Sequence, residues 1–271
     1  MHNSAKIKVC GLTRLEDVQL ALSLGADFCG FIVYPNSPRA VSFERAVELA
    51  SHVPAGKRVL VDVETPSNRL KHMHRSCFDF FQIHTKPTIN KSTLSTMSDT
   101  LGKERLWLAP RLSSKDYFAE EFTTFAETIL LDAYQKDLFG GTGHIGDWSR
   151  FNQLSSSYPQ TNWVLAGGLN PTNVLEAQAA TGARILDVNS GVESSPGFKD
   201  ANKFLELAIK DKLFNPKATI GFFEAYSSGN DIILKNKMTL NHLRQQTNKG
   251  SRKNYCLSDF IAPKDSNIKD W

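Results

Sequence analysis

Two residues suited to proton transfer, Cys10 and Asp132, stand where apolar segments of the chain end. Cys10 closes the segment 6–10, and Asp132 follows three apolar residues within 127–133. An accessible thiolate acts as a base or nucleophile, whereas a buried thiol is often only a small apolar side chain. We expect burial of Asp132 to raise its pKa and suit it to general acid catalysis. A capping or loop-organising carboxylate is the alternative.

Arg39 and His84 are the next candidates. Arg39 lies in a loop with two prolines, "YPNSPRAV" (34–41), where a guanidinium is able to bind a carboxylate through two parallel hydrogen bonds. An ordinary surface arginine is equally consistent with this position. His84 ends the segment 78–84, and a hydrogen-bonded structural histidine is favoured there over a base. His72 and His74 are two residues apart on a predicted helix, so they face different ways and are expected at the surface.

Glycine-rich turns follow three of the apolar segments. Gly140, Gly141 and Gly143 lie shortly after Asp132, where they suit a sharp bend or the approach of a ligand to the backbone. "AGGLNP" and "DVNSGVE" end the last two segments. Backbone N–H groups at such turns bind anions, and in α/β barrels the loops after strands 7 and 8 form a phosphate site. We therefore expect a phosphate ester as ligand.

The segments that position these residues read as strands alternating with helices. Helical patterns include 14–25, 42–53 with Ser42 as N-cap, and 171–182 with proline near its start and glycine after its end. The polar stretch 85–104 is the weakest helix. Strand–helix units without hairpin signals predict a parallel sheet, and eight predict a closed (β/α)8 barrel. The eight predicted strands are 6–10, 27–33, 57–63, 78–84, 105–111, 127–133, 162–168 and 184–190.

An open doubly wound sheet is the alternative architecture, but no GxGxxG motif follows the first strand. A final helix over 199–210 would complete the barrel. We thus assign residues 1–211 to a catalytic barrel and 212–271 to a C-terminal extension of unknown role, which has room for a hairpin and a helix.

Charge separates the same two regions. Residues 1–211 contain 22 Lys/Arg and 23 Asp/Glu, whereas 212–271 contain 10 and 5. The extension is mildly basic and lacks interleaved aromatic residues, so we expect no nucleic-acid partner. The start of the chain has no apolar signal region, and no apolar run is long enough to span a membrane.

The cysteines point to a reducing compartment. The chain has four, Cys10, Cys29, Cys77 and Cys256, and none forms a CxxC pair or a zinc-like spacing. Reduced thiols in the cytoplasm are the simplest interpretation.

Taken in order, the motifs resemble the phosphoribosylanthranilate isomerase family of tryptophan biosynthesis. The resemblance covers about residues 6–210, with spacing that fits throughout. The motifs are "KIKVCGLT", "GADFCGFIVYPNSPRAV", "QIH", "LLD", "GGTG", "DW", "LAGGLNPTNV" and "DVNSGVESSPGFKD".

The resemblance implies a (β/α)8 barrel that works without cofactor or metal, as a monomer or homodimer. It implies an Amadori rearrangement of N-(5-phosphoribosyl)anthranilate, with Cys10 as general base, Asp132 as general acid and Arg39 on the anthranilate carboxylate. A base of this kind requires some thiolate near neutral pH, so we expect a modest or lowered pKa for Cys10. The glycine turns correspond to the phosphate site, and His84 and Asp187 are further candidate contacts to substrate. The implied phosphate ligands are Gly143, Gly167, Gly168, Ser190 and Gly191.

Three positions depart from the family pattern. Thr85 stands where glycine is common, Gly146 where an aromatic residue precedes "DW", and "VLVDVET" replaces a "GVF" pattern. None of these is the acid, the base or the arginine, so they affect loop detail and turnover rather than reaction type.

Other functions fit the residues less well. Histidine-pathway sugar isomerases carry aspartate at the position of Cys10, and indole-glycerol-phosphate synthase needs lysines at strand ends. A non-catalytic phosphate-binding barrel that engages an acidic partner through its basic extension is the alternative from another class.

Overall fold

The computed structural model describes residues 5–113, 115–132, 148–210, 223–228 and 231–236. The chain divides into two compact units, Met1–Phe214 and Asn215–Trp271. This division falls close to the expected boundary after residue 211.

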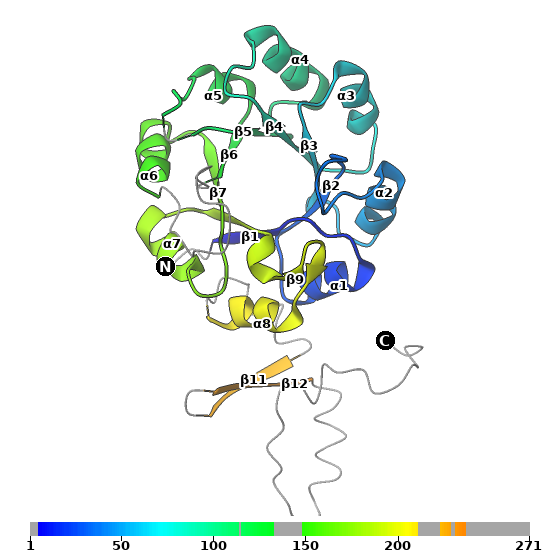
Figure 1. The fold of residues 1–271 in the computed structure, drawn as a ribbon, viewed down its shortest axis with the longest axis vertical. Helices are drawn as coiled ribbons and strands as arrows, with labels where there is room; N and C mark the ends of the chain where they lie inside the picture. Colours follow the sequence, from blue (N-terminus) through cyan, green and yellow to red (C-terminus); the bar gives the residue numbers. More distant parts are fainter. Residues whose placement is uncertain (1–4, 114, 133–147, 211–222, 229–230, 237–271) are drawn as a thin grey trace, which may run out of the picture. The chain divides into compact units, whose positions relative to one another are not determined.

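The first unit is a closed barrel of eight parallel strands (Figure 1). Strand β1 pairs with both β2 and β8, and this double pairing closes the sheet. The predicted fold class and all eight predicted strands are confirmed. The strands are β1 Lys6–Val9, β2 Phe28–Ile32, β3 Arg58–Val63, β4 Phe80–Thr85, β5 Leu106–Pro110, β6 Thr128–Asp132, β7 Asn162–Ala166 and β8 Ile185–Val188.

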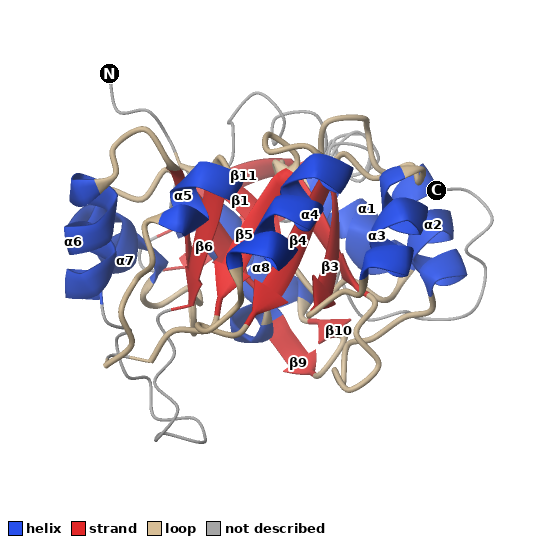
Figure 2. Cartoon of the chain, turned by 90° about the horizontal axis from the view of Figure 1, so that it is seen from above, coloured by secondary structure: helices blue, strands red, loops and turns tan. Residues whose placement is uncertain are grey.

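Helices cover the outside of this barrel, as Figures 1 and 2 show. The first seven each lie between one barrel strand and the next, as parallel pairing requires, and the eighth follows the last barrel strand. Their bounds are α1 Leu15–Ser23, α2 Phe43–Ser51, α3 Ser67–His74, α4 Lys91–Leu101, α5 Glu121–Phe125, α6 Trp148–Ser157, α7 Val174–Thr181 and α8 Ala201–Lys210.

The predicted helix ends have a local cause. Ser42 caps α2 by accepting a hydrogen bond from the Arg45 N–H at 3.1 Å. Gly182 ends α7 in the left-handed region at φ 61°, which glycine adopts without strain.

The stretch that we expected to be a poor helix, 85–104, contains the well-formed α4. Asn90 caps it through Thr93 N at 2.8 Å. Leu94, Met97 and Leu101 form its buried face at helical spacing. Those three residues outweigh the polarity of the rest of the segment.

Between β8 and α8 the chain makes a short excursion. A 3-10 turn over Ser190–Val192 leads into β9 (Glu193–Ser195), which pairs with β10 (Phe198–Lys199). The final barrel helix expected over 199–210 is confirmed as α8.

The second unit contains an antiparallel hairpin of β11 (Phe223–Ser228) and β12 (Asp231–Asn236). The hairpin that we considered for the extension is therefore present. The helix that we also considered lies outside the described residues. Within the described part of the chain, no helix is long and apolar enough to cross a membrane.

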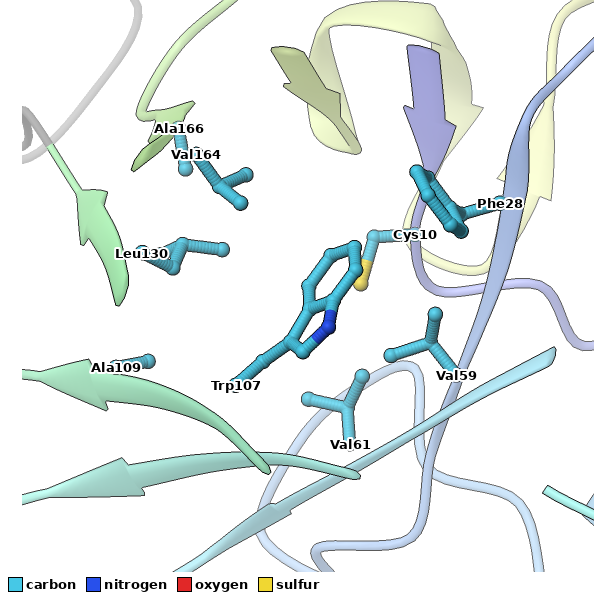
Figure 3. Close-up of a cluster of buried hydrophobic side chains, with 9 residues drawn as sticks. All are labelled: Cys10, Phe28, Val59, Val61, Trp107, Ala109, Leu130, Val164 and Ala166. Carbon is cyan, nitrogen blue, oxygen red and sulfur yellow. The ribbon is translucent and has the colours of Figure 1, made fainter. Parts of the chain in front are cut away.

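Side chains of alternate strand residues fill the barrel interior. Figure 3 shows nine of them, from Cys10 to Ala166, pointing into one shared core. Phe28, Phe80 and Trp107 form an aromatic cluster there, with ring centroids 5.0–5.7 Å apart. The interior is thus packed, which leaves the mouth of the barrel for ligands.

Candidate active site

The two-residue repeat of each strand determines which side chains face the site. On β1, Ile7 and Val9 are fully buried on the helix-facing side, whereas Lys8 and the following Cys10 have the opposite parity and face the interior. The same rule brings Asp132 and Asp187 inward from β6 and β8. Side chains that are distant in sequence therefore meet at the carboxyl ends of the strands.

These residues line a pocket with a cavity volume of about 220 Å³. It contains the proposed base and acid, both candidate substrate contacts and most of the proposed phosphate-binding backbone. The lining residues are Cys10, Ile32, Val61, Gln82, His84, Leu130, Asp132, Ala166, Gly167, Gly168, Leu169, Asp187, Asn189 and Ser190.

Cys10 lines the pocket with only 4% of its surface exposed. Burial raises the pKa of its thiol, and the nearby ammonium of Lys8 lowers the pKa only in part. The modest or lowered pKa that we expected for Cys10 is therefore wrong, because desolvation of the thiolate is the largest effect. A base at this position needs help from its neighbours.

Lys8 and Asp187 form an ion pair next to Cys10. They are register partners on β1 and β8, and the Lys8 Nζ donates to Asp187 Oδ2 at 2.7 Å. Burial alone would lower the pKa of Lys8, but the interactions with Asp187 and Cys10 together outweigh it and raise the pKa. The other oxygen of Asp187, Oδ1, is buried without a hydrogen-bond partner in the described structure. That oxygen is an acceptor suited to a ligand hydroxyl or N–H group.

Asp132 is the last residue of β6 and lines the same pocket. Its side chain is exposed. The burial that we expected to tune this carboxyl is therefore not what the structure shows. As an acid, Asp132 would depend on its place beside the ligand.

His84 is half-buried at the mouth, and its Nε2 lies 2.9 Å from Gln82 Nε2. Burial, together with the charges of Lys8 and Arg111, lowers the pKa of His84 to about 4. Because Gln82 Nε2 is a donor, the neutral ring accepts at Nε2. His84 is thus a neutral group at pH 7, which favours positioning over proton transfer.

The depressed pKa of His84 predicts that stability falls with acid. The unfolded chain, with a histidine pKa near 6.5, binds the proton that the folded state refuses, so stability is lost as pH falls from about 6.5 to 4. Because the ring keeps partial solvent contact, we expect a loss of about 2 kcal/mol. Urea unfolding of the parent and His84→Gln at pH 7.5 and 4.5 measures it.

The variant should lose about 2 kcal/mol less than the parent over this pH interval. His52→Gln, at an exposed histidine after α2, is the matched control and should behave like the parent. Equal pH dependence of the parent and His84→Gln would contradict the prediction.

The glycine turn after β7 is held by two asparagines. Gly167 and Gly168 have φ 100° and 65°, conformations that favour glycine. The side-chain amides of Asn170 and Asn173 each donate to Gly168 O at 3.1 Å. These two bonds fix the orientation of this carbonyl and stiffen the turn at the pocket.

The turn after β8 packs closely against the first. A Cβ at Gly191 would lie 2.0 Å from Leu169 O, so only glycine allows this approach. Gly191 itself is not among the pocket-lining residues, whereas its neighbour Ser190 is. Gly143, the remaining proposed phosphate ligand, lies outside the described residues.

Arg39 is not among the residues that line the pocket. Its Nε and Nη2 form a forked ion pair with Glu193 at 2.7–3.0 Å. Gly11 lies against both Arg39 and the pocket residue Asn189. A Cβ added at Gly11 would lie 2.8 Å from Arg39 Cδ and 2.6 Å from Asn189 Oδ1. Arg39, which we expected to bind the substrate carboxylate, is therefore already paired with Glu193 and does not line the pocket.

Glu193 links this arginine to a second buried cation. Its Oε1 accepts from Lys199 Nζ at 3.0 Å, and the same Nζ donates to Asn189 Oδ1 at 3.0 Å. Burial alone would raise the pKa of Glu193, but Arg39 and Lys199 outweigh it and the pKa is lowered. A chain of contacts therefore joins the pocket wall to Arg39.

Sequence reasoning missed Lys8, Gln82, Asn189, Glu193 and Lys199. A signal existed for two of them: Lys8 shares strand parity with Cys10, and Gln82 shares it with His84. The other three lie after β8, where their contacts depend on closure of the barrel. Among the described residues, no group of acidic, histidine or cysteine side chains is arranged to hold a metal ion.

Comparison with known proteins agrees with this geometry. The model of the N-(5'-phosphoribosyl)anthranilate (PRA) isomerase family matches residues 7–209. A curated enzyme of this name from Zymomonas mobilis is 32% identical over 207 residues, covering 75% of this chain and 96% of the relative. One from Acinetobacter calcoaceticus is 35% identical over 198 residues, covering 72% and 91%.

Solved structures give the same result. Phosphoribosyl anthranilate isomerase from Thermotoga maritima has a TM-score of 0.63 and 28% identity, covering 77% of this chain and 98% of its own. The isomerase in complex with reduced 1-(o-carboxyphenylamino)-1-deoxyribulose 5-phosphate has a TM-score of 0.60 and 26% identity, with the same coverage. The resemblance seen in the motifs is confirmed over the barrel, and the chain belongs to the PRA isomerase family.

Proposed function

We propose that the protein isomerises N-(5-phosphoribosyl)anthranilate to 1-(2-carboxyphenylamino)-1-deoxyribulose 5-phosphate in tryptophan biosynthesis. The observation that carries this is the meeting of Cys10 and Asp132 in one pocket bordered by the glycine turns after β7 and β8. Family membership supplies the substrate. The chemistry needs an acid and a base, and no atom leaves or joins the substrate.

The reaction divides between two groups. Asp132 protonates the ribose ring oxygen, so that the furanose opens to an iminium stabilised by the anilino nitrogen of the substrate. Cys10 then takes the proton from C2, and the resulting enolamine becomes the ketone when C1 gains a proton and the C2 hydroxyl loses one. The substrate brings its own nitrogen, so no lysine Schiff base is needed.

Binding groups surround these two. The backbone at Gly167, Gly168, Ser190 and Gly191 would hold the phosphate. Asp187 Oδ1 would accept a hydrogen bond from a substrate hydroxyl, and His84 would contact the substrate as a neutral ring. Arg39, whose Nε and Nη2 bind Glu193, would offer Nη1 to the anthranilate carboxylate.

The setting follows from the same residues. We expect a monomer or a homodimer, because the relative from Thermotoga maritima is described both as dimeric and as monomers generated from that dimer. The proposed base is a free thiol, which persists in a reducing compartment, and we therefore place the reaction in the cytoplasm.

The test is the loss of phosphoribosylanthranilate fluorescence on addition of the purified full-length protein. We expect rapid loss that slows when reduced 1-(o-carboxyphenylamino)-1-deoxyribulose 5-phosphate, the compound bound in a relative, is added. A folded protein that leaves the fluorescence unchanged would overturn the proposal and turn attention to a binding role.

A further inference from the structure

Lys8 has no part in the mechanism described above, yet it is a charged side chain with 0% exposure inside the barrel. Lysine is almost never fully buried unless it is paired. It lies in the barrel interior, two residues before Cys10 and on the same face of the chain. A hydrophobic residue would fill this space at lower cost, so the ammonium calls for an explanation.

The contacts of Lys8 point at two groups. The Nζ donates to Asp187 Oδ2 at 2.7 Å. Its charge also favours the thiolate of Cys10, two residues further along the same face of the chain, so the ammonium acts on both a carboxylate and the proposed base. Asp187 anchors the ammonium through one of its three N–H groups.

Gly30 on β2 keeps this arrangement open. A Cβ at Gly30 would lie 3.0 Å from Cys10 Sγ and 3.2 Å from Lys8 Cε. Both distances are tighter than ordinary van der Waals contacts. The missing side chain of Gly30 thus leaves the space in which the Lys8 stem and the Cys10 sulfur lie side by side.

Other charged groups around Cys10 come from several elements. Asp187 on β8 disfavours a thiolate, and Lys199 on β10 favours it more weakly than Lys8 does. His84 on β4 is neutral at pH 7, and Asp132 on β6 is an acid in the same pocket. Among these groups, Lys8 therefore lowers the pKa of Cys10 the most, against the increase that burial causes.

We propose that Lys8 is a positioning residue for the base: its ammonium, anchored on Asp187 and given room by Gly30, lies beside the sulfur of Cys10 and stabilises its thiolate form against the burial that disfavours it. Lys8 keeps its proton throughout. It touches no reacting atom of the substrate and acts only through Cys10. The kinetic part of this inference rests on the proposed function, whereas the thiol chemistry does not.

The test compares the parent with Lys8→Met, a neutral side chain of similar length. Iodoacetamide modification of the Cys10 peptide is measured across pH by mass spectrometry. We expect the modification profile to move to higher pH in Lys8→Met, because the thiolate loses its cation. We also expect kcat at pH 7 to fall about 10- to 100-fold, with KM changed less than about threefold, and part of the rate to return at higher pH.

Lys6→Met is the matched control, because Lys6 is the exposed lysine of the same strand. It removes the same charge and should leave both profiles unchanged. A folded Lys8→Met with the modification profile of the parent would overturn the proposal.

Gly30→Ala covers the case in which Lys8→Met fails to fold. It keeps every charge and places a methyl group against Cys10 Sγ and Lys8 Cε. We expect the Cys10 profile to move in the same direction as in Lys8→Met, and an unchanged profile would overturn the proposal. The modification profile of Cys10 can shift in the variants even if the parent does not isomerise the substrate. In that case the proposed function fails, whereas the role of Lys8 stands.

Discussion

Replacing Cys10 by alanine should lower kcat by about 10²-fold or more, because the C2 proton then has no base. The thiol lines the pocket and also belongs to the buried core of the barrel, so folding of the variant must be checked alongside its activity. Loss of phosphoribosylanthranilate fluorescence under saturating substrate measures the effect. Circular dichroism on the same sample shows that the barrel remains folded.

Asp132→Asn belongs to the same experiment and should lose activity to a similar extent. Asparagine keeps the shape of the side chain, but its amide N–H is too weak an acid to protonate the ring oxygen. Because Asp132 is exposed at the end of β6, the change should cost little stability. Equal losses in the two single variants, without a further equal loss in the double variant, would show that acid and base act as a unit.

Cys29→Ala is the control for the thiol. Cys29 is fully buried on β2, and its parity directs it away from the interior that Gly30 and Cys10 share. We expect it to lose some stability and to retain the kcat of the parent. If Cys10→Ala also retained the parent's kcat, Cys10 would be structural, as its burial alone allows.

The strand ends were predictable because each is marked by apolar residues followed by a polar or glycine residue. Parallel pairing brings these ends to one edge of the sheet. Cys10, Asp132 and Asp187 therefore gather in one pocket, as the spacing indicated. The local signals of Ser42 and Gly182 likewise set two helix ends.

The electrostatics of the site were not predictable, because they depend on depth within the barrel. Cys10 and Asp132 both follow apolar segments, yet the thiol is buried and the carboxyl is exposed. A linear pattern does not show which side chain the pocket wall covers. The pKa expected for Cys10 was wrong for this reason.

The departures from the family pattern around β3 and β4 also needed coordinates. Asp62 is buried against α3, where Thr65 donates to it at 2.8 Å and Arg69 lies 3.2 Å away. Glu64 adopts φ 47°, uncommon for a residue with a side chain, and pairs with Lys86 and Arg111 at the mouth. These substitutions build their own ionic contacts and leave the pocket residues in place.

The other large expected effect concerns Glu193, which is 154 residues from its partner Arg39. Its carboxylate is 4% exposed and lies against Arg39 and Lys199, whose side chains are 18% and 0% exposed. Glu193→Ala leaves two cations facing each other without their shared anion. Breaking a buried pair in this way costs about 3–5 kcal/mol, so we expect a loss of that size in urea unfolding.

Glu48→Ala is the matched control, since Glu48 pairs with Arg45 on the surface of α2 with 62% of its side chain exposed. An exposed pair is worth about 0–1 kcal/mol, so this variant should unfold almost like the parent. A similarly small loss in Glu193→Ala would show that solvent or a neighbouring group compensates both cations.

Activity separates a positioning role of Glu193 from a purely structural one. If Glu193 holds Arg39 for the anthranilate carboxylate, Glu193→Gln should raise KM more than it lowers kcat, because amide oxygen still accepts one hydrogen bond but fixes the guanidinium less firmly. Arg39→Lys in the parent should raise KM as well, since an ammonium lacks the planar fork. A Glu193→Gln protein with unchanged KM and reduced stability would confine Glu193 to the fold, and Arg39 would then reach the substrate without its help.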